Sequence, residues 1–138
     1  MKTIDSSISI SSSLNVQKTV YPILFAVAIA HLFNDLIQAV IPAAYPILKE
    51  NYNLSFTQIG LITLSYQLAA SILQPLVGLY TDKNPKPFSQ MYGMLFSLAG
   101  IITLAYASSF NFVLLAVILV GIGSSIFHPE SSRISFLA

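Results

Sequence analysis

Four polar side chains that could exchange protons or bind a polar solute interrupt an apolar stretch of the chain. They are His31, Asn34, Asp35 and Gln38. Their spacing of i, i+3, i+4 and i+7 places them on one face of a helix. A carboxylate gives up or takes a proton when its surroundings change between wet and dry, and histidine titrates near neutral pH. The two amides donate and accept hydrogen bonds.

The segment that carries these side chains, residues 20–48, exceeds the ~20 apolar residues that a helix needs to cross a bilayer. A carboxylate in hydrocarbon costs about 2.5–3.5 kcal/mol on insertion scales. We therefore expect Asp35 and His31 to serve in proton coupling, and Asn34 and Gln38 to lie along a substrate path that water can reach. The alternative is that the stripe only hydrogen-bonds to neighbouring helices.

The composition extends this interpretation to the whole chain. Hydrophobic residues make up 55% of the sequence and charged residues only 8%, whereas soluble domains are about 25% charged. Four long segments carry almost no charge, which predicts an all-α, polytopic membrane protein with four transmembrane helices. These spans cover about residues 20–48, 56–80, 88–108 and 112–133. The Ser-rich residues 1–19 are expected to form a disordered cytoplasmic tail.

The few charges indicate orientation and exclude several functions. Lys83 and Lys86 lie between the second and third spans, and lysines also precede the first span, so the positive-inside rule places the N-terminus in the cytoplasm. Six Lys and Arg residues spread along the chain do not form a nucleic-acid surface. The chain has no cysteine, no nucleophile elbow and no Gly-rich phosphate loop. We expect neither an enzyme nor a cofactor.

The second span carries its own line of small and polar residues. Gln67, Ser71, Gln74 and Gly78 follow one another at i, i+4, i+7 and i+11. Gln67 and Gln74 could face the substrate path, or they could bond to the first span, because uncharged amides also join membrane helices.

The inner end of the fourth span holds a second group of ionisable residues. Glu130 and Arg133 lie three residues apart and can pair within one helix, and His128 precedes them. We expect these three to act in gating at the cytoplasmic mouth, against the alternative that they simply end the helix. His31, Asp35, His128 and Glu130 do not have a spacing that demands zinc, so no metal site is predicted.

The loop after the second span resembles a signature of the major facilitator superfamily of transporters. Residues 78–83 run Gly-Leu-Tyr-Thr-Asp-Lys, a glycine followed four residues later by an aspartate and then a basic residue. The resemblance implies that Gly78, Asp82 and Lys83 belong to a cytoplasmic hinge, in which Asp82 caps the helix and pairs with Lys83 or Lys86. Pro85 and Pro87 depart from the usual pattern.

Longer runs are similar to the fosmidomycin-resistance-type efflux family within that superfamily. Residues 31–38 (His-Leu-Phe-Asn-Asp-Leu-Ile-Gln) carry this similarity, and so do residues 58–64, 73–78 and 120–133. The resemblance implies twelve spans in two six-helix halves, an inner-membrane location, and export of a drug in exchange for protons. By it, this chain is the front part of one half and depends on further transporter helices that a longer chain would supply.

We therefore predict a proton-coupled exporter of small polar or anionic drugs, with the lipid bilayer, a small-molecule substrate and protons as its partners. Two alternatives stay open. The chain could be a complete four-helix small multidrug transporter acting as a homodimer, or a non-transporting assembly or regulatory fragment.

Overall fold

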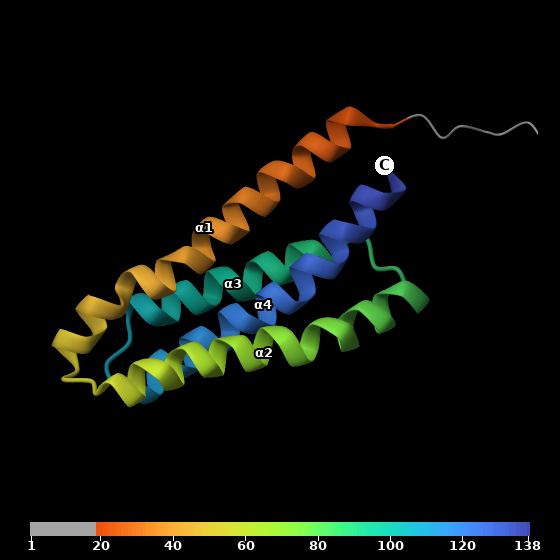
Figure 1. Ribbon diagram of the computed structural model, residues 1–138. Helices are drawn as coiled ribbons and strands as arrows, with labels where there is room; N and C mark the ends of the chain where they lie inside the picture. The colour runs from red at the N-terminus through yellow and green to blue at the C-terminus, as the bar shows by residue number, and fades with distance from the viewer. Residues whose placement is uncertain (1–18) are drawn as a thin grey trace, which may run out of the picture.

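The structure, a computed structural model, describes residues 19–138, and within that range it forms four helices and no strand (Figure 1). The helices are α1 (Tyr21–Asn51), α2 (Phe56–Lys83), α3 (Ser89–Ala105) and α4 (Phe110–Leu137). Consecutive helices run in opposite directions, so the end of α2 lies at the same end of the bundle as the end of α4. The predicted disordered tail lies outside the described residues up to residue 18.

The helix ends differ from the predicted spans because apolar composition marks only the part of a helix that lies in lipid. α1 continues through Lys49 and Glu50 to Asn51, and α2 continues through Asp82 to Lys83. These polar residues extend each helix beyond its apolar segment. α3 is shorter than predicted, since it ends at Ala105 and the connection to α4 starts there rather than at Ser109.

Three of these helices are long and apolar enough to cross a membrane: α1, α2 and α4. α3 has 17 residues, which at 1.5 Å per residue gives a length of about 25 Å. That is near the lower limit of spanning lengths, about 17 residues. The expected polytopic, all-α fold class is confirmed.

The start of α2 shows how local sequence fixes a helix end. The Ser55 hydroxyl accepts a hydrogen bond from the Gln58 backbone N–H (3.2 Å), and the Gln58 side chain accepts one from the Ser55 N–H (2.9 Å). This reciprocal pair satisfies two backbone donors that the first turn of a helix leaves free. Ser followed three residues later by Gln just before an apolar run is the sequence pattern of a capping box, and the structure forms one here.

α4 is the centre of the bundle and packs extensively against both α2 and α3. Glycines allow this close approach. A Cβ added at Gly121 would lie 2.7 Å from the Tyr66 carbonyl oxygen of α2, and one added at Gly123 would lie 2.6 Å from the Gly93 carbonyl oxygen of α3. Small residues at these positions let neighbouring membrane helices bring their backbones together.

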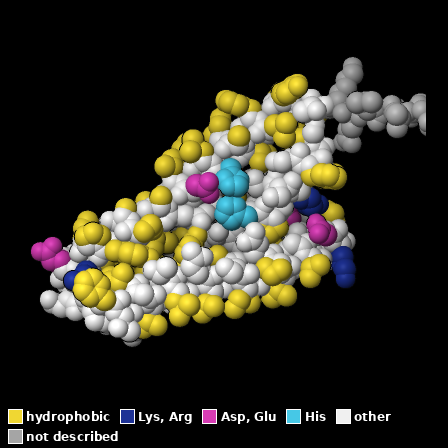
Figure 2. All heavy atoms as spheres, viewed as in Figure 1, with side chains coloured by type: hydrophobic (Ala, Val, Ile, Leu, Met, Phe, Trp, Pro, Cys, Tyr) yellow, Lys and Arg dark blue, Asp and Glu magenta, His cyan; other side chains and the backbone are white. Residues whose placement is uncertain are grey.

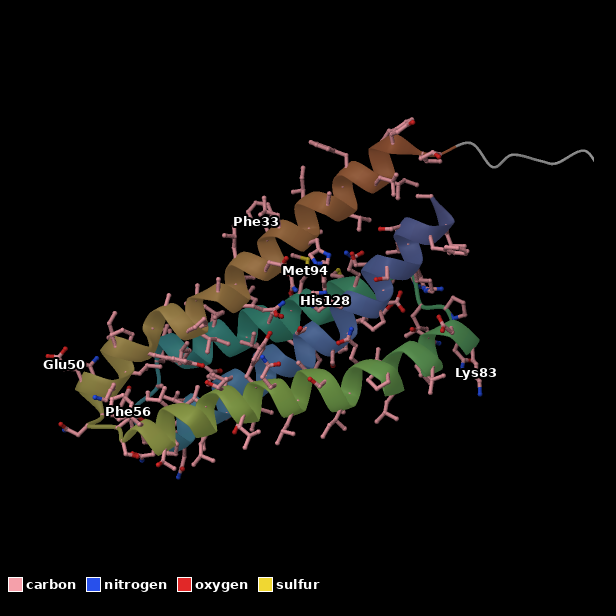
Figure 3. The ribbon with its side chains drawn as sticks, viewed as in Figure 1. Phe33, Glu50, Phe56, Lys83, Met94 and His128 are labelled. Carbon is pink, nitrogen blue, oxygen red and sulfur yellow. The ribbon has the colours of Figure 1, made fainter. Side chains whose placement is uncertain are left out.

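α1 makes fewer contacts with the other three helices than α4 makes with α2 or α3, and its N-terminal part diverges from α2 and α3 (Figure 1). Just before it, the Val20 N–H donates to the Ala138 carbonyl oxygen at the end of α4 (2.7 Å). Near the other end of α1, Ile41 and Leu48 join the apolar core formed by Val113, Val117 and Val120 of α4. The outer face of α1 carries exposed apolar side chains such as Phe33, which points away from the bundle (Figure 3).

Replacing Gly123 by alanine should destabilise the bundle. The new methyl group would meet the Gly93 backbone at 2.6 Å, a separation that forces α3 and α4 apart. Overpacking of this kind costs about 1–3 kcal/mol. Thermal unfolding in detergent should therefore show a lower Tm. Gly60→Ala is the matched control, because nothing lies within 4 Å of its added Cβ. Equal Tm values for the two variants would contradict this account of the packing.

Candidate functional site

His31 and Asp35 lie on the side of α1 that turns toward α4. Nε2 of His31 is 3.5 Å from Oδ2 of Asp35, and the side chains are 41% and 55% exposed. Nδ1 of His31 lies 3.4 Å from the Ser131 hydroxyl of α4. Figure 2 shows the two histidines of the chain side by side on this face, with an acidic side chain next to them. The groups expected to handle protons are therefore together and accessible.

Gln38 is the central member of a polar network that joins three helices. Its amide oxygen accepts hydrogen bonds from the Tyr66 hydroxyl of α2 and from the Ser124 hydroxyl of α4 (3.4 Å). Its amide nitrogen lies 3.5 Å from Nε2 of His128. Because an amide nitrogen only donates, this contact is a hydrogen bond when Nε2 of His128 carries no proton.

His128 lies beside His31 and Asp35 of α1. Its ring centroid is 5.0 Å from that of His31, and its side chain points from α4 toward α1 (Figure 3). The prediction grouped it with Glu130 and Arg133 by sequence. The side chains of His128 and Glu130 point in nearly opposite directions, because each residue of a helix is turned by about 100° from the one before it.

Asn34 occupies a different environment from its neighbours on the stripe. Its side chain is fully buried, its Oδ1 is 3.5 Å from the Ser97 hydroxyl of α3, and its Nδ2 has no hydrogen-bond partner. In this conformation Asn34 does not line the cavity beside Asp35. A substrate contact at Asn34 therefore needs a conformation in which α1 has moved.

Glu130 and Arg133 form the expected ion pair near the C-terminal end of α4, with Nη2 and Oε2 2.8 Å apart. The Glu130 side chain is 1% exposed. Thr81 of α2 and Ser89 of α3 lie beside the carboxylate. Their hydroxyls donate to the backbone carbonyls of Gly78 and Lys86, and Oε1 of Glu130 has no hydrogen bond. The pair is therefore formed within α4, and it is buried where α4 packs against the end of α2 and the start of α3.

The polar line predicted on α2 does not join the network around Gln38. Gln67 and Gln74 are both exposed. The residue that does reach Gln38 is Tyr66, directly before Gln67. Gly78 lies against α4 instead, where an added Cβ would come within 3.7 Å of Pro129.

The ion pair expected for Asp82 is absent from the part of the chain that the structure describes. Asp82 and Lys83 are exposed, and neither lies within salt-bridge distance of an opposite charge there. The reason is that α2 continues through both residues, and adjacent side chains on a helix do not face each other.

Four hydroxyl-bearing residues of the site were not predicted from the sequence: Tyr66, Ser97, Ser124 and Ser131. Each hydrogen-bonds to a side chain of the α1 stripe. Their common signal is a polar atom within an apolar span, which must find a partner in lipid. That signal does not say which helix supplies the partner, so only the packing of the bundle identifies them.

Between α1 and α4 lies an open cavity of about 430 Å³, whose lining includes the polar residues His31, Asp35, Ser131 and Ser135. The Asp35 carboxylate and the His31 imidazole, 3.5 Å apart, border this cavity and are both exposed in part. The amide and hydroxyl groups around Gln38 add donors and acceptors for a polar solute.

Comparison with known proteins agrees with a bundle of membrane helices built around such a site. The sequence pattern of the protein family described as the Major Facilitator Superfamily matches residues 27–136 of the chain. The chain therefore belongs to the major facilitator superfamily, a family of transporters. It is a multi-pass membrane protein and not an enzyme. No solved structure matches the chain.

Two close relatives sharpen this placement. The chain is 52% identical to the "Fosmidomycin resistance protein" of Escherichia coli (strain K12) over 93% of its length, and 48% identical to the "Uncharacterized MFS-type transporter YfnC" of Bacillus subtilis (strain 168) over 87%. It covers 32% and 29% of these relatives, so the chain spans less than a third of their length. A more distant relative is the "Lincomycin resistance protein LmrB" of Bacillus subtilis (strain 168), 26% identical over 82% of the chain and 24% of the relative.

Arg133→Met should strongly destabilise the protein. It leaves the Glu130 carboxylate buried without its cation, and breaking one side of a buried pair costs about 3–5 kcal/mol. The Tm in detergent should fall. The double variant Glu130→Gln with Arg133→Met should recover much of that loss, because it removes both charges.

Lys83→Gln is the control for this prediction. It removes an exposed cation at the same end of the bundle, which has no ion pair, and should leave the Tm unchanged. If the double variant were no more stable than Arg133→Met, the buried charge would not be the cause of the loss.

Proposed function

We propose that this chain forms the first four helices of a longer inner-membrane exporter, which moves small polar or anionic drugs out of the cell in exchange for protons. The remaining helices would come from a C-terminal part of the length seen in its relatives. The printed names of two relatives, which refer to resistance to fosmidomycin and to lincomycin, support a drug as the substrate.

The observation that carries the proposal is the position of Asp35. In a helix whose outer face contacts lipid, this carboxylate is 55% exposed and borders a cavity between α1 and α4. A carboxylate in a transmembrane helix is costly and is normally retained for a path of ions or substrate. Asp35 would take up and release the coupling proton, and His31, 3.5 Å away, would pass it to and from water.

Gln38 is proposed as the main substrate contact, because its network already presents several hydrogen-bonding groups to the space between the helices. Asn34 would contribute its unpaired amide nitrogen once α1 has moved. Gln67 and Gln74 would contact the substrate only if further helices enclose their exposed face of α2.

Gating is assigned to the inner end of the bundle. The Glu130–Arg133 pair is buried where α4 packs against the ends of α2 and α3, and breaking it would loosen this contact during the rocking motion by which such transporters alternate access. Gly78, Asp82 and Lys83 lie where α2 ends and would act as the hinge. Lys83 and Lys86 at this end support a cytoplasmic N-terminus.

Asp35→Asn in the complete protein should abolish drug-driven proton movement. The amide keeps the shape and polarity of the exposed side chain but cannot carry a proton, so expression and folding should be little affected. The measurement uses inside-out membrane vesicles with an imposed pH gradient, in which adding fosmidomycin to the active exporter releases protons. A pH-sensitive dye follows the release.

The matched control is Glu50→Gln, which changes an exposed carboxylate at the opposite end of α1 (Figure 3). This variant should behave as the wild type. Drug-driven proton release of normal size in Asp35→Asn vesicles would remove Asp35 from the coupling mechanism.

A further inference from the structure

Three metal-binding side chains converge where α1 passes α4. They are His31 and Asp35 of α1 and His128 of α4, and one ligand atom from each lies within 4.8 Å of the other two. His31 and Asp35 are neighbours on one helix, so their proximity follows from i, i+4 spacing alone. The arrival of His128 from another helix does not follow from that spacing, and it makes the group a three-ligand set.

The donor atoms suit a divalent transition metal. Two imidazole nitrogens and one carboxylate oxygen, without thiolates, form a set that binds Zn²⁺ and also Co²⁺ or Ni²⁺, while Mg²⁺ and Ca²⁺ prefer oxygen alone. Three protein ligands leave one tetrahedral position for water. Glu130, which the sequence analysis considered beside these residues, is buried against α2 and α3 and does not take part.

The geometry needs only a small adjustment to close on an ion. Ligand atoms about 2.0–2.1 Å from Zn²⁺ in a tetrahedron stand about 3.3 Å from one another. His31 and Asp35 are already 3.5 Å apart, and both side chains are about half exposed. The remaining separations of up to 4.8 Å therefore close by rotation of side chains, without rearrangement of the helices.

The surroundings provide the orientation and the access that a metal site requires. Ser131 lies 3.4 Å from Nδ1 of His31, which holds the ring with Nε2 toward Asp35. Hydrogen bonding of the second nitrogen is the usual way in which a ligand histidine is fixed. The open cavity of about 430 Å³ beside His31 and Asp35 gives an ion a route from water.

We propose that His31, Asp35 and His128 bind a single divalent transition-metal ion, with Zn²⁺ as the best fit, in a site that bridges α1 and α4. The site goes beyond the proposed exporter function, which requires no metal. Sequence spacing predicted no such site, because ninety-seven residues separate His31 from His128 and only the packing of α4 brings them together. A bound ion would fasten α1 to α4 where the hydrogen bonds between their side chains are 3.4–3.5 Å long.

The test measures Zn²⁺ binding to the complete protein in detergent, purified with an affinity tag that contains no histidine. Competition with a fluorescent zinc chelator gives affinity and stoichiometry. The expected result is one Zn²⁺ per protein. His31→Gln and His128→Gln should each weaken binding by at least about tenfold, and Ser131→Ala by about tenfold through loss of orientation. Glu50→Gln, a carboxylate far from His128, should bind as the wild type does (Figure 3).

A spectroscopic measurement keeps the test decisive if a histidine variant folds poorly. Co²⁺ added to the wild-type protein should give the visible absorption of a tetrahedral ion with nitrogen ligands, and an excess of Zn²⁺ should remove it. Zn²⁺ binding that persists in both histidine variants, or a wild-type protein with no such Co²⁺ spectrum, would overturn the proposal. Neither measurement uses a drug or a pH gradient, so failure here leaves the transport proposal standing, and the reverse also holds.

Discussion

The need to satisfy polar groups inside a membrane governs how α1 is attached to the rest of the bundle. Lipid supplies no hydrogen-bond partners, so each polar side chain must find one in protein or in trapped water. Along the part of α1 that carries the stripe, the partners are the hydroxyls of Ser97, Ser124 and Ser131, the phenol of Tyr66 and the imidazole of His128. Nearly all of these partners belong to α3 and α4, so the polar stripe determines which way α1 faces.

The other three helices are held together by a different constraint. α4 approaches α2 at Gly121 and α3 at Gly123, at distances where no side chain fits between the backbones. Packing of this kind depends on shape and cannot be loosened gradually, because small gaps forfeit much of the contact energy. The bundle therefore consists of a closely packed unit of α2, α3 and α4, with α1 joined to it by polar contacts and by the apolar cluster around Ile41 and Leu48. A transporter that changes conformation can exchange hydrogen bonds more easily than it can separate glycine-packed backbones.

Sequence patterns predicted the elements of this fold well and their pairings poorly. Apolar length predicted the helices, and the spacing of Ser55 and Gln58 predicted the start of α2, because both depend on residues close in the sequence. The Glu130–Arg133 pair was predictable for the same reason. The partners of Gln38 were not, since whether Tyr66 or Gln67 faces α1 depends on the rotation of α2 about its axis. That rotation is set by where Gly121 meets Tyr66 and Ala69, a contact between distant parts of the chain.

The sequence left two interpretations of the polar stripe on α1 open: hydrogen bonding to neighbouring helices, or lining a path for solutes. The two edges of the stripe lie in different environments. Asn34 and Asp35 are adjacent, and adjacent residues on a helix point about 100° apart. The bundle buries the Asn34 side completely and leaves Asp35 at the edge of the cavity, with His31 and Gln38 between them in angle. The Asn34 edge of the stripe therefore packs against the neighbouring helices, and the Asp35 edge borders the open cavity. Rotation of α1 about its axis by about 100° would exchange these environments, and a smaller rotation would change how deeply the carboxylate is buried, without separating α4 from α2 or α3.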